Sequence, residues 1–186
     1  DLGAILIGKS TLDELAMGGT GTTGHLGTTY NPYDPTHTRL IGGSSCGSAV
    51  SVSDAIVPFA LGSDTGDSVR KPASFAGLVG FKPTWGNISR FGLFPFAPSM
   101  DHVAYFTRSV KDAAIALKVL AFQDENDSTS SYKVRDNYTN YVPSVKGKKI
   151  AVINQILNSI DDEKVKECFA SSIKFLKKNG AEVGYI

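Results

Sequence analysis

Short apolar stretches alternate with polar, glycine-rich turns along the first two thirds of the chain. The pattern predicts a strand over residues 2–10 and then a short helix over 10–18, capped by Ser10 or Thr11 with an acidic residue three positions on. A loop rich in glycine, threonine and proline follows. Further elements are expected in this order: a helix over 44–55, a strand over 56–64, a helix from 68 to 73, a strand over 78–84 and an amphipathic helix over 109–122.

The last part of the chain has its own pattern. Residues 131–146 are polar and predict a linker, and residues 147–186 predict a β–α–β unit that extends the same domain. Its helix is expected to end at Gly180, with Val165, Phe169, Ile173 and Leu176 packing inward. Alternating strands and helices indicate an α/β fold with a mixed, largely parallel sheet flanked by helices.

Composition excludes several classes of protein. The chain of 186 residues has 41% hydrophobic residues and a formal net charge of +1, so no basic surface for nucleic acid is indicated. Asp54 and Pro58 interrupt the longest apolar run, and no signal peptide or membrane span is predicted. With only two cysteines, a disulfide framework is not expected, and the cytoplasm is the expected location.

Two turns rich in serine and glycine carry the candidate chemistry: GGSSCGS at 42–48 and GSDTGDS at 62–68. Their small residues let the two loops approach closely, so that Ser44 and Ser68 meet beside exposed backbone N–H groups. That arrangement suits nucleophilic attack on a carbonyl. Such loops also serve as plain turns or phosphate sites, although neither turn matches a phosphate-binding fingerprint.

The sequence GGSSCGSAV, followed by GSDTGDSVRKPASFAGLVGFKPTWG, resembles the signature of the amidase signature family. IGKSTLDELAMGG and NPYDP upstream resemble the same family. Downstream, GNISRFGLFPFAPSMDHVAYFTRSVKDAAIAL and DENDSTS are similar to one branch, the A subunits of glutamyl-tRNA(Gln) amidotransferases. The resemblance extends to about Ser130 and implies the amidase signature fold.

The resemblance also implies a Ser–cis-Ser–Lys triad. Ser68 corresponds to the nucleophile that forms an acyl ester, and Ser44 to the bridging serine that follows a cis peptide bond from Gly43. A buried, neutral lysine receives the proton through Ser44. The backbone N–H groups of Thr65, Gly66 and Asp67 are then expected to hold the oxyanion.

Some residues near the two serines support the loops or depart from the family pattern. Arg70 is expected to brace the second loop by pairing with Asp64. Asp67 and Cys46 stand where the family has glycine. Asp67 should resist a positive φ, and its carboxylate should point away from the oxyanion. Cys46 as an alternative nucleophile has no evident base.

The lysine of the triad belongs to a tract that precedes residue 1, and the residues that bind glutamine follow residue 186. Lys9 corresponds to a different lysine. The sequence, which begins at Asp1 without Met, is therefore expected to be a fragment of a protein more than twice as long, and inactive by itself.

The implied activity is hydrolysis of glutamine to supply ammonia to partner subunits B and C, where ATP and Mg²⁺ are used on Glu-tRNA(Gln). No cofactor is expected in the chain itself. His25, His37 and His102 lack metal-binding spacing, so no metal site is expected. Two alternatives remain open: a stand-alone amidase acting on small amides, and an inactive truncated amidase that serves as a binding module.

Overall fold

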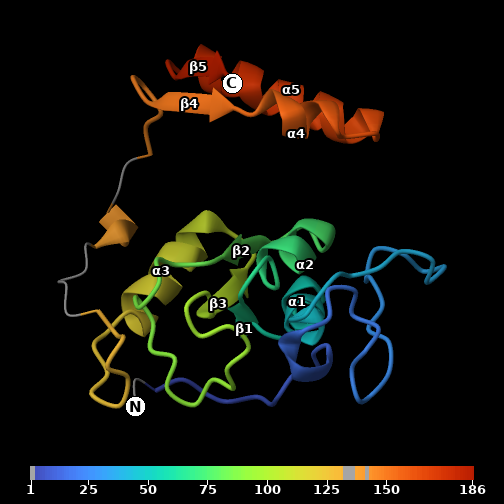
Figure 1. Ribbon diagram of the computed structural model, residues 1–186, viewed down its shortest axis with the longest axis vertical. Coiled ribbons are helices and arrows are strands. Elements are labelled where there is room, and N and C mark those ends of the chain that lie inside the picture. Colours follow the sequence, from blue (N-terminus) through green and yellow to red (C-terminus); the bar gives the residue numbers. More distant parts are fainter. Residues whose placement is uncertain (1–2, 132–136, 141–142) are drawn as a thin grey trace. The chain divides into compact units, whose positions relative to one another are not determined.

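A computed structural model describes residues 3–131, 137–140 and 143–186, and the chain divides into units 1–140 and 141–186. The division falls inside the predicted linker, part of which lies outside the described residues. No helix in the described ranges combines the length and the apolar character needed to cross a membrane. The elements of the first unit (Figure 1) are η1 Glu14–Ala16, α1 Cys46–Ser53, β1 Phe59–Asp64, α2 Arg70–Phe75, β2 Val79–Phe81, β3 His102–Thr107, α3 Val110–Leu120 and η2 Tyr138–Asn140.

The first unit contains a three-stranded sheet with the order β1–β3–β2. Both pairs are antiparallel, with Leu61 and Phe81 each opposite Tyr105. The α/β class is confirmed, but the largely parallel arrangement does not hold in this sheet. β1 and β2 run in the same direction, as a strand–helix–strand unit requires, and β3 is inserted between them. β3 is not among the predicted elements, although VAYFT is a short apolar run typical of a buried strand.

Helices cover both faces of this sheet. Adjacent side chains of a strand point to opposite faces, and in β3 Phe106 packs with α1 and α2 while Tyr105 packs with α3. Both side chains are fully buried. The cluster around Phe106 includes Val52 of α1 and Ala73 of α2. The segment between β1 and α2, which carries Ser68, is therefore anchored to the core on both sides.

The beginning of the chain differs from the prediction. Residues 3–10 contain no strand, and the apolar side chains of Ile5, Leu6 and Ile7 are exposed, because no strand among the described residues pairs with this segment. The expected helix is the single turn η1, and its N-cap position is Asp13 rather than Ser10 or Thr11. The Asp13 side chain makes no capping hydrogen bond because its carboxylate binds the segment after η1.

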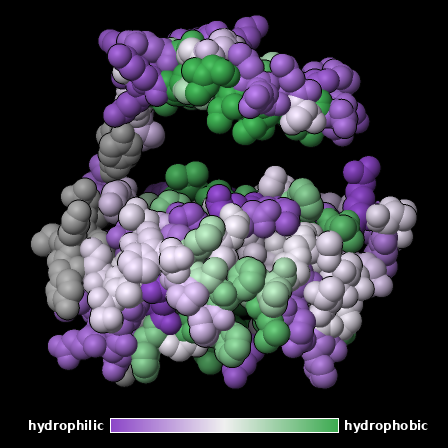
Figure 2. All heavy atoms as spheres, viewed as in Figure 1, coloured by the Kyte–Doolittle hydropathy of each residue, from purple (hydrophilic) through white to green (hydrophobic). Residues whose placement is uncertain are grey.

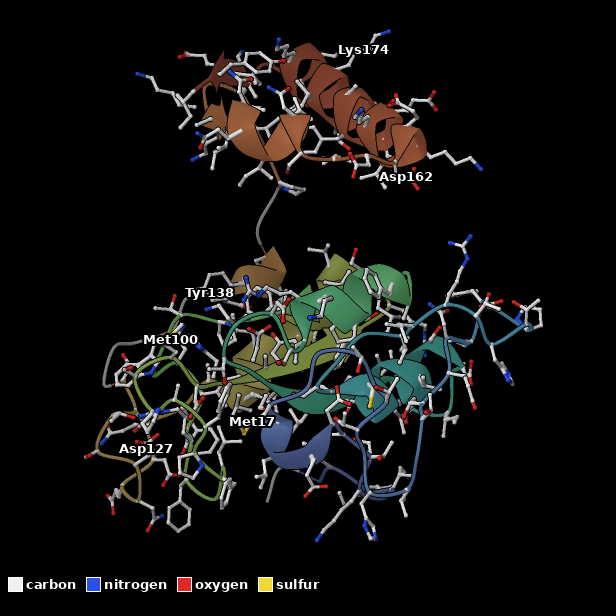
Figure 3. The ribbon with its side chains drawn as sticks, turned by 45° about the vertical axis from the view of Figure 1, so that its right-hand side comes forward. Met17, Met100, Asp127, Tyr138, Asp162 and Lys174 are labelled. Atoms are coloured by element: carbon white, nitrogen blue, oxygen red, sulfur yellow. The ribbon has the colours of Figure 1, made fainter. Side chains whose placement is uncertain are left out.

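The second unit consists of β4 Lys149–Val152, α4 Asn154–Asn158, α5 Glu163–Lys178 and β5 Glu182–Tyr185, and its two strands are parallel. Asp162, labelled in Figure 3, caps α5 by accepting hydrogen bonds from the backbone N–H groups of Lys164 and Val165. The helix ends as predicted: the N–H of Gly180 donates to Lys177 O at 3.0 Å, and that of Ala181 donates to Leu176 O at 3.1 Å. The short helix α4 is not predicted.

The apolar face of α5 is only partly buried in this unit. Ile173 is buried as predicted, whereas Val165 and Phe169 are exposed in this unit, because no other described element of the unit packs over them. Leu157, Phe169, Ile173 and Tyr185 line an open groove of about 370 Å³. Figure 2 shows apolar residues gathered on one face of this unit, with hydrophilic residues around them.

The contact between α2 and β2 leaves no room for a side chain at Gly80. A Cβ there would lie 2.6 Å from Ala73 Cβ and 3.0 Å from Val69 O. We expect Gly80→Ala to lower the free energy of unfolding by about 1–3 kcal/mol, because backbone or helix must move. Urea unfolding followed by circular dichroism measures this change. The control is Gly8→Ala, where a Cβ meets nothing within 4 Å; equal effects of the two variants would contradict a steric role for Gly80.

Candidate functional site

The first serine loop joins Ile41 in the core to α1. The peptide bond between Gly43 and Ser44 is cis, as the family resemblance implies. Ser44 is completely buried, and its carbonyl oxygen accepts a hydrogen bond from the N–H of Asp13 at 3.0 Å. The N–H of Ser45 donates to Ser68 O at 3.2 Å. This backbone hydrogen bond holds the two predicted serine loops against each other.

The second loop turns the chain from β1 into α2 around the buried carboxylate of Asp64. That carboxylate accepts from the N–H groups of Val69 and Arg70 at 3.0 and 3.2 Å. The Arg70 guanidinium donates to both carboxylate oxygens, with its Nη2 2.9 Å from Oδ1. The predicted pairing of Arg70 with Asp64 is thus present. Burial acts to raise the pKa of Asp64, but Arg70 and the backbone donors outweigh it and the pKa is lowered.

Ser44 and Ser68 are both buried, and the hydroxyl of Ser44 differs from that of an ordinary structural serine. Ser68 is buried at the entry to α2, with 9% of its surface exposed. Ser44 Oγ is buried and has no hydrogen-bond partner among the described residues. A buried hydroxyl usually finds a partner, so this one requires an explanation. The relay between Ser44 and Ser68 stays a prediction, because no hydrogen bond joins their hydroxyls in the described part of the chain.

The loop between β1 and Ser68 offers free backbone donors. No backbone carbonyl in the described ranges accepts from the N–H groups of Thr65, Gly66 or Asp67. The Thr65 hydroxyl donates to Asp101 Oδ1 at 2.6 Å, and the same buried carboxylate accepts the N–H groups of residues 96 and 97. Asp101, which is not among the residues predicted from the sequence, therefore fixes the start of the segment predicted to form the oxyanion hole.

Asp67 fits this loop without the expected backbone conflict. It is not among the non-glycine residues with positive φ, so this position does not require glycine. Its carboxylate forms an ion pair with Lys71, with Oδ2 3.0 Å from Nζ. The sequence predicts that this carboxylate points away from the oxyanion, but it does not single out Lys71.

Asp13 is a supporting residue that is not predicted from the sequence. Its carboxylate is fully buried and accepts from the N–H groups of Thr20, Gly21 and Thr23 and from the Thr23 hydroxyl, at 2.9–3.1 Å. Burial acts to raise the pKa of Asp13, but these hydrogen bonds outweigh it and the pKa is lowered. In the sequence, only the place of Asp13 within STLDELAMGG could indicate its role, and an acidic residue there is explained equally well by the start of a helix.

The other candidate residues have structural contacts. Cys46 is 1% exposed, and its thiol donates to Thr11 O at 3.8 Å, so it is inaccessible to a substrate. The ring of His37 stacks on Tyr30, and His102 Nε2 lies 3.1 Å from Lys82 Nζ. Lys9 and His25 line a cavity of about 530 Å³ that includes neither Ser44 nor Ser68. Within the described residues, no cluster of three or more His, Cys, Asp or Glu is placed to hold a metal.

Two tracts that carry the family resemblance, SRFGL and DENDSTS, contact each other in the structure. The Ser89 hydroxyl donates to Asp124 Oδ2 at 2.6 Å, and the N–H of Arg90 donates to Asp127 Oδ2 at 2.8 Å. Asp127 is labelled in Figure 3 in the loop after α3. Arg90 also stacks over Trp85, with 4.5 Å from its guanidinium carbon to the ring centre. These tracts thus stabilise one loop cluster.

The Asp64–Arg70 pair predicts a pH-dependent stability effect. In the wild type, the lowered pKa means that stability from Asp64 is present above its unfolded pKa and is lost as pH falls through the folded one. In Arg70→Met the guanidinium no longer offsets burial, although the two backbone donors remain, so the pKa of Asp64 should rise relative to the wild type and its ionisation should contribute less stability. We expect a loss of roughly 2–4 kcal/mol at about pH 7 that shrinks towards about pH 4.

Urea unfolding at several pH values measures this difference, with Lys166→Met as the control because Lys166 forms an exposed pair with Glu163. If Arg70→Met lowers the free energy of unfolding by the same amount at every pH, the loss does not come from the Asp64–Arg70 ion pair.

Comparison with known proteins agrees with this geometry. The Amidase family profile matches residues 1–186. The chain is 47% identical over 184 residues to the A subunit of glutamyl-tRNA(Gln) amidotransferase of Staphylococcus haemolyticus, covering 98% of this chain and 38% of that protein.

Solved structures show the same relationship. The structure of the A subunit of glutamyl-tRNA(Gln) amidotransferase from Thermotoga maritima superposes with a TM-score of 0.92 at 42% identity, over 98% of this chain and 40% of that one. Allophanate hydrolase of Kluyveromyces lactis gives 0.85 at 32% identity, over 99% and 29%. The chain spans less than half the length of these relatives. From its matched sequence and its fold, the chain belongs to the amidase family.

Proposed function

We propose that this chain is part of the glutamine-hydrolysing A subunit of a glutamyl-tRNA(Gln) amidotransferase. The observation that supports it most directly is the buried hydroxyl of Ser44, which has no hydrogen-bond partner among the described residues. The loop of Ser44 is joined to the loop of Ser68 by a backbone hydrogen bond. A proton relay needs a hydroxyl with free donor and acceptor positions. The identity to named A subunits, 47% over 98% of the chain, supports the choice of substrate.

In this proposal Ser68 Oγ attacks the side-chain carbonyl carbon of glutamine. Its proton passes through Ser44 to a lysine, which we propose is supplied by a part of the protein that precedes residue 1. The negative charge on the tetrahedral oxygen is stabilised by the free N–H groups of Thr65, Gly66 and Asp67.

Collapse of this intermediate breaks the C–N bond. Ammonia leaves with the proton returned by the relay, and a glutamyl ester remains on Ser68. Water then hydrolyses the ester to glutamate. The ammonia serves partner subunits B and C, which use ATP and Mg²⁺ to convert Glu-tRNA(Gln) to Gln-tRNA(Gln). The residues that select glutamine are expected beyond residue 186.

A second candidate is a stand-alone amidase that acts on small amides. The superposition on allophanate hydrolase favours it, because the fold of this chain is shared by a relative that is named for a different activity. The two candidates differ in their dependence on partners. Full amide hydrolysis by the full-length protein alone, on substrates other than glutamine, would favour the stand-alone amidase.

Replacement of the nucleophile tests both candidates. In the full-length protein with its partner subunits, Ser68→Ala should lower glutamine hydrolysis by about a thousandfold or more, because no acyl ester can form. Release of glutamate measures the rate. Ser74→Ala, at an exposed position of the helix α2 that follows Ser68, is the matched control. Retained hydrolysis in Ser68→Ala would overturn the assignment. Absence of any activity in the wild type would favour the inactive binding module.

Ser44→Ala separates a relay from a structural role. Because Ser44 Oγ has no hydrogen-bond partner among the described residues, its removal should change the free energy of unfolding by less than about 1 kcal/mol. The same variant should lower kcat for glutamine by about a hundredfold or more. Thermal unfolding and steady-state kinetics are measured on one preparation. Loss of stability in proportion to loss of activity would contradict the relay.

A further inference from the structure

Four charged side chains surround the nucleophile loop in two pairs. The fully buried Asp64 pairs with Arg70, whose side chain is partly exposed, and the exposed Asp67 pairs with the half-buried Lys71. The Arg70 guanidinium also donates to Gly66 O. The four formal charges sum to zero. Loss of Lys71 would leave one uncompensated carboxylate on the residue that directly precedes Ser68.

The position of Lys71 is set by the helix and by two glycines. Its N–H donates to Asp67 O at 2.8 Å, which places both side chains one helical turn apart on the same face. The side chain then crosses Gly42, where a Cβ would lie 3.4 Å from Lys71 Cγ. Its ammonium group ends beside Gly19, where a Cβ would lie 2.8 Å from Nζ. Side chains at these glycines would crowd the lysine.

An unpaired Asp67 carboxylate would oppose the proposed reaction. The N–H of Asp67 belongs to the segment proposed to hold the oxyanion. The Asp67 carboxylate is therefore carried by a residue that itself is proposed to bind the developing negative charge. An unpaired carboxylate there would repel that charge, and Asp side chains readily accept from nearby backbone N–H groups. In this structure both carboxylate oxygens are bound instead by Lys71 Nζ, at 3.2 and 3.0 Å.

We infer that Lys71 is a positioning residue of the amidase site: it holds the Asp67 carboxylate away from the oxyanion donors and neutralises its charge. This inference rests on the proposed function and adds a residue to it. Lys71 acts through Asp67 and does not touch the reacting atoms. An exposed ion pair with no such role would contribute little to stability or activity.

The test is a double-mutant cycle in the full-length protein with its partner subunits, measured as kcat/KM for glutamine hydrolysis. Lys71→Met should lower kcat/KM by about tenfold, because the freed carboxylate opposes the oxyanion. In the Asp67→Gly background, Lys71→Met should have no further effect. Lys71→Arg should retain most of the activity, since it keeps the charge. Lys166→Met, which breaks a different exposed pair, is the matched control.

Salt gives a second readout that a purely structural lysine would not change. When NaCl is raised from about 0.05 M to about 0.5 M, the loss of kcat/KM in Lys71→Met should become smaller, because salt screens the repulsion between the Asp67 carboxylate and the oxyanion. The inference is overturned if Lys71→Met lowers kcat/KM no more than the control Lys166→Met does. It is also overturned if Lys71→Met lowers kcat/KM as much in the Asp67→Gly background as in the wild type.

Failure of the proposed function has a different signature. If the wild type hydrolyses another amide and not glutamine, the same cycle is run on that amide and the inference is judged there. If the wild type hydrolyses no amide and Ser68 is not labelled by a fluorophosphonate, both the proposed function and the role of Lys71 are rejected.

Discussion

The site depends first on one buried carboxylate, that of Asp64 at the end of β1. A carboxylate without solvent must be compensated, and here two backbone N–H groups and a guanidinium provide the compensation. All three donors come from Val69 and Arg70, directly after Ser68. Satisfying the charge therefore forces the chain to turn sharply between β1 and α2. The nucleophile candidate lies in that turn because the turn brings the donors back to Asp64.

Two further buried carboxylates use the same principle on neighbouring loops. The Asp13 carboxylate accepts from the N–H groups of Thr20, Gly21 and Thr23, and the N–H of Asp13 donates to Ser44 O. Asp101 holds Thr65 and the loop at 96–97. Each carboxylate fixes a loop with little regular structure, since charge-assisted hydrogen bonds are stronger than neutral ones. Loops fixed in this way can keep donors and hydroxyls in place before a substrate arrives.

How much of the fold follows from the sequence depends on the range of the interaction. Local signals are reliable: the end of α5 just before Gly180, the helix α3 and the Asp64–Arg70 pair are all predicted. Long-range pairing is not. β3 is not predicted, and its insertion between β1 and β2 makes both strand pairs of the first sheet antiparallel, whereas β4 and β5 are parallel. The exposed segment 3–10 has a strand-like composition but no pairing partner among the described residues, and composition cannot reveal a partner.

The candidate site is predicted more fully than the fold, because its residues are close in sequence. Ser44, Ser68 and the free N–H groups all come from two short turns. Asp13 and Asp101 are not predicted, since each lies far from Ser44 and Ser68 in the sequence and a lone Asp has many possible uses. Lys71 is not predicted for a different reason, because its importance follows only from the carboxylate that replaces glycine at position 67.

Close approach explains which glycines of the two turns are required and which are replaceable. A Cβ at Gly43 would lie 2.0 Å from Asp13 Oδ2, and one at Gly47 would lie 2.7 Å from Thr11 O. These positions exclude any side chain, so the serine loop can be held by Asp13 only if glycine is present. A Cβ at Gly66 meets nothing within 4 Å, and Asp67 beside it extends into solvent. Positions 66 and 67 of the second loop therefore tolerate a side chain that Gly43 and Gly47 of the first loop cannot take. An acidic side chain is acceptable at position 67 because a lysine lies one helical turn away.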